Sequence, residues 1–554
     1  MASGSLREGL GGLVSRAGER VADVAWAVGV LTRAGIVRPL RPDRAAQIGQ
    51  RFIRWGASPA LGVAASAINY PDETALVDEA GTLTFEQLHR RSNALAHALE
   101  AAGVRPGDGV AIMCRNHRYF ILATLACSKL GASALYLNTA FAAPQLADVM
   151  ERERPSALIY DEEFADLLDV EDQETRRFVA WSEGDPGDPS LDELIDGADD
   201  SDLSPPEEQG RYVILTSGTT GKPKGAQRES PSGLMPLAAL FSKIPHQRRE
   251  KIVVSAPLFH SWGFLHFVIG LPLAATLILR RRFDPEDALR TVAEHGAEVL
   301  AVVPVMMQRI LELPPEVKRR NDVSSLRITA ASGSSLPGEL SARWMDEFGD
   351  NLHQLYGSTE VAWATIATPE DMREAPGTAG KPPRGTTVRI VDERGEDVPP
   401  GETGRIFVGN EGLSFEGYTG GGDKEHLGDL LSSGDVGHFD ENGRLFIDGR
   451  DDEMIVSGGE NVFPREVEDL LSDHEAIAEA AAVGVEDEKF GQRLRAFVVT
   501  REGKRVSEAD LKAYVKENLA RYKVPREIVF MEELPRNATG KVLKRELTEH
   551  RVAD

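Results

Sequence analysis

The sequence of 554 residues has little of several features that mark particular protein classes. Its two cysteines, Cys114 and Cys127, cannot build a disulfide framework and lack the spacing of a metal site. No apolar run is long enough to span a bilayer, and the N-terminus has no apolar signal core. Positive charge is also scarce, because 88 acidic residues outnumber 63 lysines and arginines, for a net charge of −25. We therefore expect a cytoplasmic protein that is not a general nucleic-acid binder.

The rest of the composition is typical of a globular protein with more than one domain. Residues 84–87 (TFEQ) form a capping-box pattern at the start of an expected helix. Apolar runs at 110–113 and 133–137 predict strands, and the segment 120–130 between them predicts a helix. This alternation indicates βαβ units and a mainly parallel sheet. Further strands are predicted at 251–256, 298–303 and 326–330.

From residue 388 the pattern changes to short strands separated by turns, and a smaller unit starts at Asp451. We predict an N-terminal extension (1–55), a large domain (56–450) and a small domain (451–554). The expected fold class is α/β, with stacked βαβ sheets and a short β-rich subdomain in the large domain and an α+β small domain. The acidic segment 183–208 is expected to be a solvated excursion from the large domain.

The N-terminal extension is basic although the whole protein is acidic. Residues 1–55 contain nine arginines, no lysine and four acidic residues, for a net charge of +5. Apolar residues at helical spacing could form one face of a helix: Val21, Val24, Ala25, Val28 and Leu31. Such a face could lie on an anionic membrane, which would place the protein at the inner side of that membrane, or it could pack on the body of the protein.

One short segment, 215–226 (LTSGTTGKPKGA), combines four hydroxyls, three glycines and two lysines directly after an apolar run. Glycines let backbone N–H groups approach a ligand, and hydroxyls and lysines add donors and charge, so the segment predicts a phosphate cradle rather than a flexible polar loop. No glycine stands five positions before Gly221, and neither Ser nor Thr follows Lys222. The pattern therefore argues against a Walker-type hydrolase or kinase.

Six further segments occur in a fixed order after this one. They are 257–260 (PLFH), 332–336 (SGSSL), 356–360 (YGSTE), 433–450 (SGDVGHFDENGRLFIDGR), 457–464 (SGGENVFP) and 537–547 (NATGKVLKREL). Together with 215–226 they resemble the adenylate-forming (AMP-binding) superfamily, and most of all its acyl-CoA synthetases. The resemblance extends from about Pro71 to Arg545. It implies that a carboxylic acid is joined to AMP, with loss of pyrophosphate, before the acyl group moves to a thiol.

The resemblance also implies roles for single residues in the first step. The β- and γ-phosphates of ATP would be held by Thr216, Ser217, Gly218, Thr219, Thr220, Gly221 and Lys224. Glu360, with Thr219, would bind Mg²⁺, which prefers carboxylate and phosphate oxygens. The adenosine would contact Gly333, Ser334, Ser335, Tyr356, Gly357, Thr359, Asp435 and Arg450. Lys541 would bridge the attacking carboxylate and the α-phosphate, where negative charge gathers in the transition state.

For the second step, the family rotates a mobile small domain about a hinge, which Asp452 would provide here. The rotation would bring Ser457, Gly458, Gly459 and Glu460 to coenzyme A. His260 resembles the gate between acyl pocket and thiol tunnel. The acyl pocket would lie between Trp262 and Gly263 on one side and Gly357, Val361 and Ala362 on the other. Where family members often have a Thr-His pair, this chain has Gln227-Arg228-Glu229. The resemblance therefore does not identify the residues at the floor of the acyl pocket.

The function expected from these residues is that of an ATP-dependent acyl-CoA ligase acting on a small-molecule carboxylic acid. The segment 457–468 and the basic extension favour a medium- or long-chain fatty acid. The alternatives are an aryl-CoA ligase and an acyl-AMP ligase that loads a free-standing carrier protein. No aspartate in 257–264 would bind an amino group, which argues against an amino-acid substrate.

Overall fold

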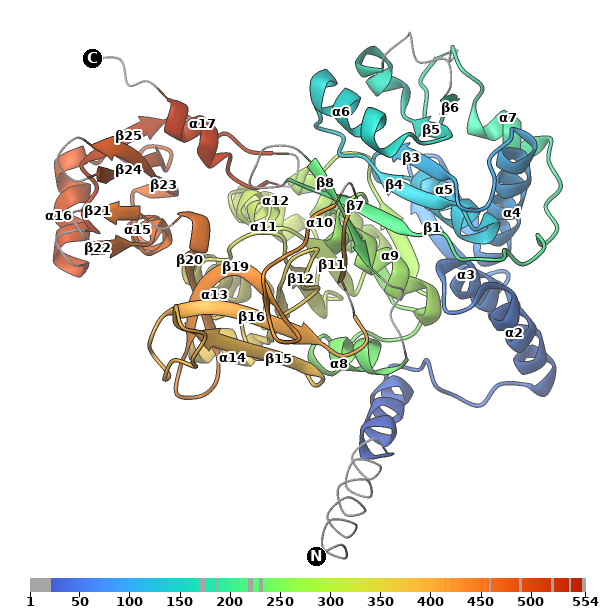
Figure 1. Cartoon of the computed structure of the whole chain (residues 1–554), viewed down its shortest axis with the longest axis horizontal. Helices are drawn as coiled ribbons and strands as arrows, with labels where there is room; N and C mark the ends of the chain where they lie inside the picture. Colours follow the sequence, from blue (N-terminus) through green and yellow to red (C-terminus); the bar gives the residue numbers. More distant parts are fainter. Residues whose placement is uncertain are drawn as a thin grey trace, which may run out of the picture.

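The computed structural model describes residues 21–168, 175–184, 187–217, 223–228, 233–413, 415–419, 421–453, 455–457, 460–487, 491–519, 523–537 and 540–550. The chain folds into a large N-terminal domain of mixed α/β structure and a smaller C-terminal domain. Figure 1 shows the small domain, in orange to red, at one end of the molecule, joined to the rest near β20 (Leu445–Arg450).

The first sheet of the large domain, sheet A, has eight strands in the order β14-β13-β12-β11-β9-β10-β1-β2. Its strands are β1 (Thr74–Asp78), β2 (Gly81–Thr84), β9 (Lys251–Val254), β10 (Thr276–Leu279), β11 (Val299–Val302), β12 (Ile328–Ala331), β13 (Leu352–Tyr356) and β14 (Thr365–Ala367). The six central strands run parallel, and β2 and β14 pair antiparallel at the two edges. A parallel sheet must be covered on both faces, which explains its continuous apolar runs.

The second sheet, sheet B, has seven strands in the order β17-β8-β7-β4-β3-β5-β6. Its strands are β3 (Gly109–Met113), β4 (Ser133–Tyr136), β5 (Ala157–Tyr160), β6 (Arg176–Val179), β7 (Tyr212–Ser217), β8 (Pro223–Arg228) and β17 (Phe415–Tyr418). Alternate residues of one strand enter different cores, as the period of two requires: Val110 and Ile112 join the main core, whereas Ala111 and Met113 join a second one. Sheet B is therefore buried on both faces.

Helices cover both sheets. In the large domain they are α2 (Pro42–Trp55), α3 (Pro59–Asn69), α4 (Phe85–Ala101), α5 (Arg118–Leu130), α6 (Ala143–Glu153), α7 (Leu191–Asp196), α8 (Met235–Lys243), α9 (Ser261–Leu273), α10 (Pro285–His295), α11 (Pro304–Leu311), α12 (Pro315–Arg320), α13 (Gly338–Phe348) and α14 (Pro369–Glu374). Helix α9 touches both sheets, because Trp262 donates to the carbonyl of Val302 in sheet A and Phe264 packs on Tyr136 and Tyr212 in sheet B.

Two smaller sheets complete the fold. Sheet C is the β-rich subdomain, with β15 (Thr386–Val391), β16 (Gly404–Asn410), β18 (His426–Leu427), β19 (Leu430–Phe439) and β20. Sheet D belongs to the small domain, with β21 (Ile455–Ser457), β22 (Glu460–Val462), β23 (Ile477–Asp487), β24 (Gly491–Thr500) and β25 (Glu527–Met531). Helices α15 (Pro464–Ser472), α16 (Glu508–Asn518) and α17 (Lys544–Glu549) pack on it, so the small domain has hydrophobic clusters of its own.

Two expectations for the large domain need correction. The acidic segment 183–208 is not simply solvated, because Leu191, Ile195 and Leu203 are buried in the main core. The predicted N-terminal apolar face is buried on the body of the protein only at its C-terminal end. A helix over residues 21–33 buries Leu31 but leaves Val21 and Val24 exposed at 70% and 57%. The predicted capping box at Thr84 is confirmed at the start of α4.

Among the described residues, no helix is both long and apolar enough to cross a membrane.

Candidate active site

The carboxyl ends of four parallel strands of sheet A meet at one edge, and a segment singled out in the sequence follows three of them. Residues 257–260 follow β9, residues 332–336 follow β12, and residues 356–360 extend from the last residue of β13. Val303 follows β11 between them. In open parallel sheets this edge is where ligands bind, because the connecting loops there are free to carry polar groups.

The phosphate-loop candidate is a hairpin of sheet B. Strands β7 and β8 pair antiparallel, with Thr216 opposite Lys224 and Ser217 opposite Pro223. The tip of the hairpin, which carries Gly218, Thr219, Thr220 and Gly221, lies outside the described residues, as do the side chains of Thr216, Ser217 and Lys224. Strands β7 and β8 therefore flank the predicted cradle in the chain on both sides.

The loop over residues 356–360 is held tightly in place. A methyl group on Gly357 would stand 2.0 Å from the carbonyl oxygen of Ala362, so only glycine fits there. Ala362 itself has a φ of 61°, a left-handed conformation that is rare for residues other than glycine. The Ser358 hydroxyl accepts the backbone N–H groups of Glu360 and Val361 at 3.3 Å. Such local constraint is common where a side chain must be aimed at a ligand.

Glu360, the predicted Mg²⁺ ligand, is only 8% exposed and has a tyrosine beside it. The hydroxyl of Tyr418 donates to Oε1 of Glu360 at 2.8 Å. Burial and this carboxylate together raise the pKa of Tyr418, which therefore stays a donor at neutral pH. Tyr418 belongs to β17, whose partner is β8 of the phosphate hairpin. No sequence pattern singles out Tyr418, because its contact with Glu360 forms only in the folded chain.

Asp435 lies at the centre of a second polar group. The hydroxyl of Tyr356 donates to Oδ2 of Asp435 at 2.5 Å, and Arg450 donates to Oδ1 at 3.2 Å. Strands β19 and β20 place Asp435 directly opposite Arg450. Lys424 was not predicted: a methyl group on Gly434 would stand 3.4 Å from its Nζ and 3.2 Å from Arg450. Two cations therefore lie next to Gly434, and one of them, Arg450, pairs with Asp435.

Three residues predicted to lie beside the adenine follow β12. Gly333 and Ser335 are exposed and Ser334 is partly exposed, so the segment is open to a ligand. Ser332, just before them, is buried, and its hydroxyl donates to the carbonyl of Leu355 at 2.7 Å. Thr359 lies partly exposed in the neighbouring loop.

The turn that carries Lys541 is docked on the large domain next to these residues. Gly540 has a φ of 81°, and a methyl group there would stand 2.3 Å from Cγ1 of Val305 and 3.8 Å from Cγ2 of Val303. A methyl group on Gly333 would stand 3.3 Å from Cγ1 of the same Val303. The exposed Lys541 therefore lies in a turn that shares a neighbour with the predicted adenine segment.

Polar contacts accompany this docking of the small domain. Arg501 pairs with Glu339 of α13 at 3.2 Å, and the amide of Gln308 donates to the carbonyl of Ala478 at 3.2 Å. Burial and the nearby Glu339 raise the pKa of Asp473, at the end of α15, to about 6. The polar part of this interface is thus one part-buried ion pair, one hydrogen bond and a carboxylate whose ionisation burial disfavours, as expected for domains that can separate.

The predicted acyl side is mainly apolar. Trp262, Trp363 and Ala362 all belong to or pack against the main core. Val361 does not join them, because its side chain packs in the separate core of the β-rich subdomain. Gly263 is buried in the first turn of α9.

His260 precedes α9 and has an unusual environment. Its Nε2 is buried and has no hydrogen-bond partner among the described residues. Burial lowers the pKa of His260 to about 4, so the ring is neutral at pH 7. A buried polar atom without a partner is rare in folded proteins and marks a place where a ligand or water can bind.

The predicted hinge and the predicted CoA loop are only partly described. Asp452 lies in a 3-10 turn (Asp451–Glu453) directly after β20, and Arg405 of sheet C pairs with Asp451 at 2.9 Å. The side chain of Asp452 lies outside the described residues, as do Gly458 and Gly459 and the side chains of Ser457 and Glu460.

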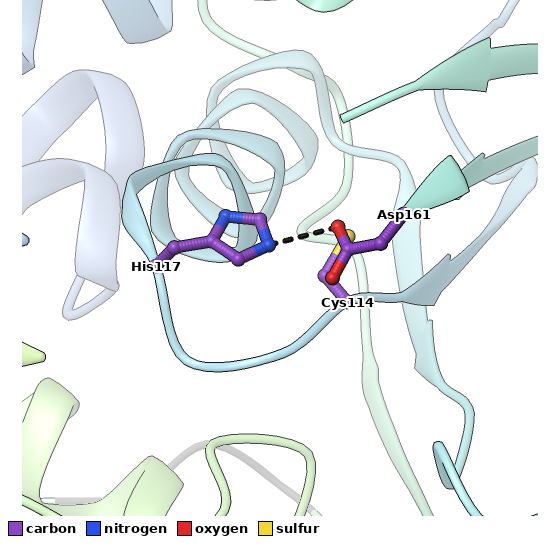
Figure 2. Close-up of side chains that lie close together, drawn as sticks. All are labelled: Cys114, His117 and Asp161. Atoms are coloured by element: carbon purple, nitrogen blue, oxygen red, sulfur yellow. Dashed lines mark hydrogen bonds and ion pairs between the residues drawn. The ribbon is translucent and has the colours of Figure 1, made fainter. Parts of the chain in front are cut away.

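A separate buried cluster has the residue types of a metal site. Figure 2 shows Cys114, His117 and Asp161 side by side in the large domain. Nε2 of His117 lies 2.8 Å from Asp161, and Nδ1 accepts the backbone N–H of Tyr119, so the proton is on Nε2. The other oxygen of Asp161 accepts the N–H of Arg115. These bonds occupy the ring and both carboxylate oxygens, and they explain the cluster as a cap that fixes the start of α5.

Comparison with known proteins gives the same picture over most of the chain. Residues 63–419 match the family described as AMP-binding enzyme, and residues 466–541 match the AMP-binding enzyme C-terminal domain. A feruloyl-CoA synthase of Amycolatopsis sp is 34% identical over 484 residues, 86% of this chain and 96% of that protein. A fatty acid–[acyl-carrier-protein] ligase of Streptomyces coeruleorubidus is 31% identical over 496 residues, 86% of this chain and 93% of that protein.

A solved structure of an anthranilate CoA ligase in complex with anthranoyl-AMP superposes with a TM-score of 0.80 at 26% identity. The match covers 89% of this chain and 96% of that one. Sequence, fold and the arrangement of polar groups therefore lead to one conclusion. The chain belongs to the AMP-binding enzymes and is an AMP-forming acid–thiol ligase of the acyl- or aryl-CoA ligase type, which works through an acyl-AMP.

Proposed function

We propose that the enzyme joins a carboxylic acid to AMP in the docked arrangement described above and then passes the acyl group to coenzyme A after its small domain has rotated. The observation that carries this proposal is the position of the Lys541 turn. It packs on Val305 and Val303, and Val303 also borders Gly333. A cation held there can meet the charge that develops around the α-phosphate.

The other residues divide the work of the first step. The hairpin tip at 218–222 holds the β- and γ-phosphates, and Asp435 accepts hydrogen bonds from the ribose hydroxyls with Arg450 beside it. Glu360 is the protein ligand for Mg²⁺, an ion that would neutralise phosphate charge, and Tyr418 orients its carboxylate. A buried carboxylate that keeps one oxygen for a metal and has the other fixed by a donor suits that ion.

The second step needs a thiol at the acyl carbon, where the Lys541 turn stands in the docked arrangement. Rotation about Asp452 removes the turn and brings residues 457–460 to the site. The neutral His260, with its free Nε2, lies at the start of α9 and borders the path of the thiol. Because the His260 ring is neutral, no unpaired charge is buried there when the CoA thiol is absent.

The acid is an apolar one, and we place aromatic acids first. Trp262 and Trp363 both belong to the main core and flank the segments predicted to form the acyl pocket, and flat rings pack well on aromatic side chains. The relatives named above include ligases for feruloyl and anthraniloyl groups, which supports this class. The medium- or long-chain fatty acid expected from the sequence is the second candidate, supported by the one relative that takes a fatty acid.

Pyrophosphate release across a panel of aromatic and fatty acids of graded length tests the function and the substrate class together. We expect the highest kcat/KM with a substituted benzoate or cinnamate. Lys541→Ala is the matched control and should lower adenylate formation at least a hundredfold while thioester formation from supplied acyl-AMP persists. Release of orthophosphate instead of pyrophosphate, or equal loss of both steps, would contradict the proposal.

The thiol acceptor is tested by a competition. Coenzyme A and a holo-carrier protein are offered at equal concentration to enzyme preloaded with acyl-AMP, and both thioesters are quantified. We propose that CoA is the main product, and a predominance of acyl-carrier protein would assign the enzyme to the carrier-loading class instead. We also propose that the N-terminal extension contacts a membrane, for the structural reasons developed next.

A further inference from the structure

Exposed apolar side chains are concentrated near the N-terminus. Among the described residues, the large apolar side chains that stand exposed are Val21 (70%), Val24 (57%), Phe52 (55%), Ile53 (86%), Leu234 (46%) and Phe530 (44%). The first four lie in residues 21–55, on the helix over residues 21–33 and on α2. Single exposed apolar residues are common, but four of them in one basic stretch of 35 residues require a physical explanation.

These two helices are firmly attached to the body, so the exposed residues are not the result of loose segments. The first helix buries Ala27, Val30 and Leu31 in the main core. On α2, Arg51 pairs with the part-buried Asp202 at 2.6 Å, and Trp55 is fully buried. With the inward faces occupied in this way, Phe52 and Ile53 point outward on α2.

An arginine cluster lies between the two helices. The guanidinium groups of Arg38, Arg248 and Arg249 all stand 5.3 to 5.7 Å from the ring centre of Tyr70, within cation–π distance. Arg248 also donates to the hydroxyl of Tyr70. Glu73 pairs with Arg249, but no carboxylate of the described residues pairs with Arg38 or Arg248. Three like charges on one ring, with a single acid beside them, create a site that attracts anions.

We propose that this surface, formed by residues 21–55 and the Arg38–Tyr70–Arg248–Arg249 cluster, docks on a membrane that contains anionic lipid. The outward apolar side chains enter the interfacial layer, and the arginines contact lipid phosphates. Figure 1 shows the first described helix at the bottom of the view and α2 at the lower right, with the segment that joins them running between.

The charge distribution selects this edge over all others. The protein carries a net charge of −25, so most of its surface is repelled by an anionic membrane, whereas residues 1–55 carry +5. A protein partner would fit less well, since the cores of protein interfaces are depleted of charge. The docking edge also leaves the active site free. Arg248 and Arg249 come just before β9, at the amino end of the strand, whereas the site lies at the carboxyl ends.

Co-sedimentation of the full-length enzyme with vesicles tests the proposal. Vesicles of phosphatidylcholine alone are compared with vesicles that also contain phosphatidylglycerol. We expect binding to the anionic vesicles that falls as salt is raised, and much weaker binding to the neutral ones. The double variant Phe52→Ser/Ile53→Ser should weaken binding about tenfold or more, and Arg38→Ala/Arg248→Ala about 25-fold, near fivefold for each guanidinium removed. Phe530→Ser replaces the exposed aromatic of the small domain (44%), is the matched control and should bind like the wild type.

Two further measurements separate this proposal from the catalytic one. Turnover of a water-soluble acid without vesicles should be the same in all variants, which shows that they fold. Sedimentation velocity without lipid shows whether the surface joins copies of the chain. Equal binding to neutral and anionic vesicles, no loss in the two variants, or an oligomer that dissociates in Phe52→Ser/Ile53→Ser would each overturn the membrane assignment.

Discussion

Gly540→Ala is the substitution that tests the docked arrangement most directly. Gly540 touches no predicted ligand, but a methyl group there would stand 2.3 Å from Cγ1 of Val305. Carbon atoms in contact prefer about 3.5 Å, so the turn that carries Lys541 has to withdraw by about 1 Å. Gly540 also has a φ of 81°, and alanine costs about 1 kcal/mol in that conformation whether or not the turn is docked.

The two costs affect the two steps differently. A displacement of about 1 Å at a charged catalytic group lowers a rate on the order of a hundredfold, and this penalty applies only when the turn is docked. We therefore expect adenylate formation to fall about a hundredfold, while thioester formation from supplied acyl-AMP changes only a few-fold. Rapid-quench measurement of pyrophosphate release follows the first step, and chromatography of the CoA thioester follows the second.

Val305→Ala supplies the compensating variant. It removes the methyl groups that the new Cβ of Gly540→Ala would meet, so the double variant should recover at least tenfold of the lost adenylation rate. Val305→Ala alone should have a small effect, because Val305 is only partly buried. Equal loss in both steps, or no recovery in the double variant, would refute the contact between the turn and α11 as the basis of the first step.

Three other changes probe separate parts of the molecule. Tyr418→Phe removes the donor to Glu360 and should raise the Mg²⁺ concentration for half-maximal pyrophosphate release about tenfold, while the CoA concentration required stays the same. An unchanged Mg²⁺ requirement would exclude an orienting role for Tyr418. The pKa of Asp473 is raised to about 6 in the docked arrangement, so the docked arrangement favours the protonated carboxyl and docking should strengthen as pH falls from 7 to 5. A fluorophore pair across the two domains measures the docked fraction at each pH. Asp473→Asn should abolish the pH dependence of that fraction. Asp452→Pro should stiffen the hinge, so that adenylate forms but its transfer to CoA slows at least tenfold; normal transfer would remove Asp452 from that role.

Local signals predicted the strands and helices of the large domain well. The capping box at Thr84 starts α4, and the apolar run 110–113 is β3 of a sheet buried on both faces. These features depend on residues close together in the chain. The N-terminal helix was harder, because apolar spacing alone does not tell which side of a helix meets the body. Its core face uses Ala27 and Val30 together with Leu31, and Val21 and Val24 remain outside.

The candidate site shows the same limit. Motif segments identified Glu360, Asp435 and Lys541, and the fold brings their loops to one edge of sheet A or beside it. The partners of these residues could not be found in the same way. Tyr418 and Lys424 lie in a stretch without a recognised pattern, and their positions depend on β17 pairing with β8 and on the turn before β19. Val361 looked like a pocket residue from its place in the chain, but its side chain packs in the other core.

The charges at the site suggest why pyrophosphate release and domain rotation belong together. Lys424 and Arg450 belong to the large domain, whereas Lys541 arrives with the small domain. In the proposed first step, these three cations would face a triphosphate with several negative charges. When pyrophosphate leaves, most of that negative charge leaves with it, and three cations around the single phosphate of an acyl-AMP repel one another more than they are attracted. Withdrawal of Lys541 relieves this repulsion, and it uncovers the acyl carbon at the same time. Loss of pyrophosphate would thus lower the cost of opening an interface whose other polar contacts are few, such as the part-buried Arg501–Glu339 pair. On this reasoning added pyrophosphate should slow the CoA step by holding the small domain in its docked position, an effect that Lys541→Ala would remove.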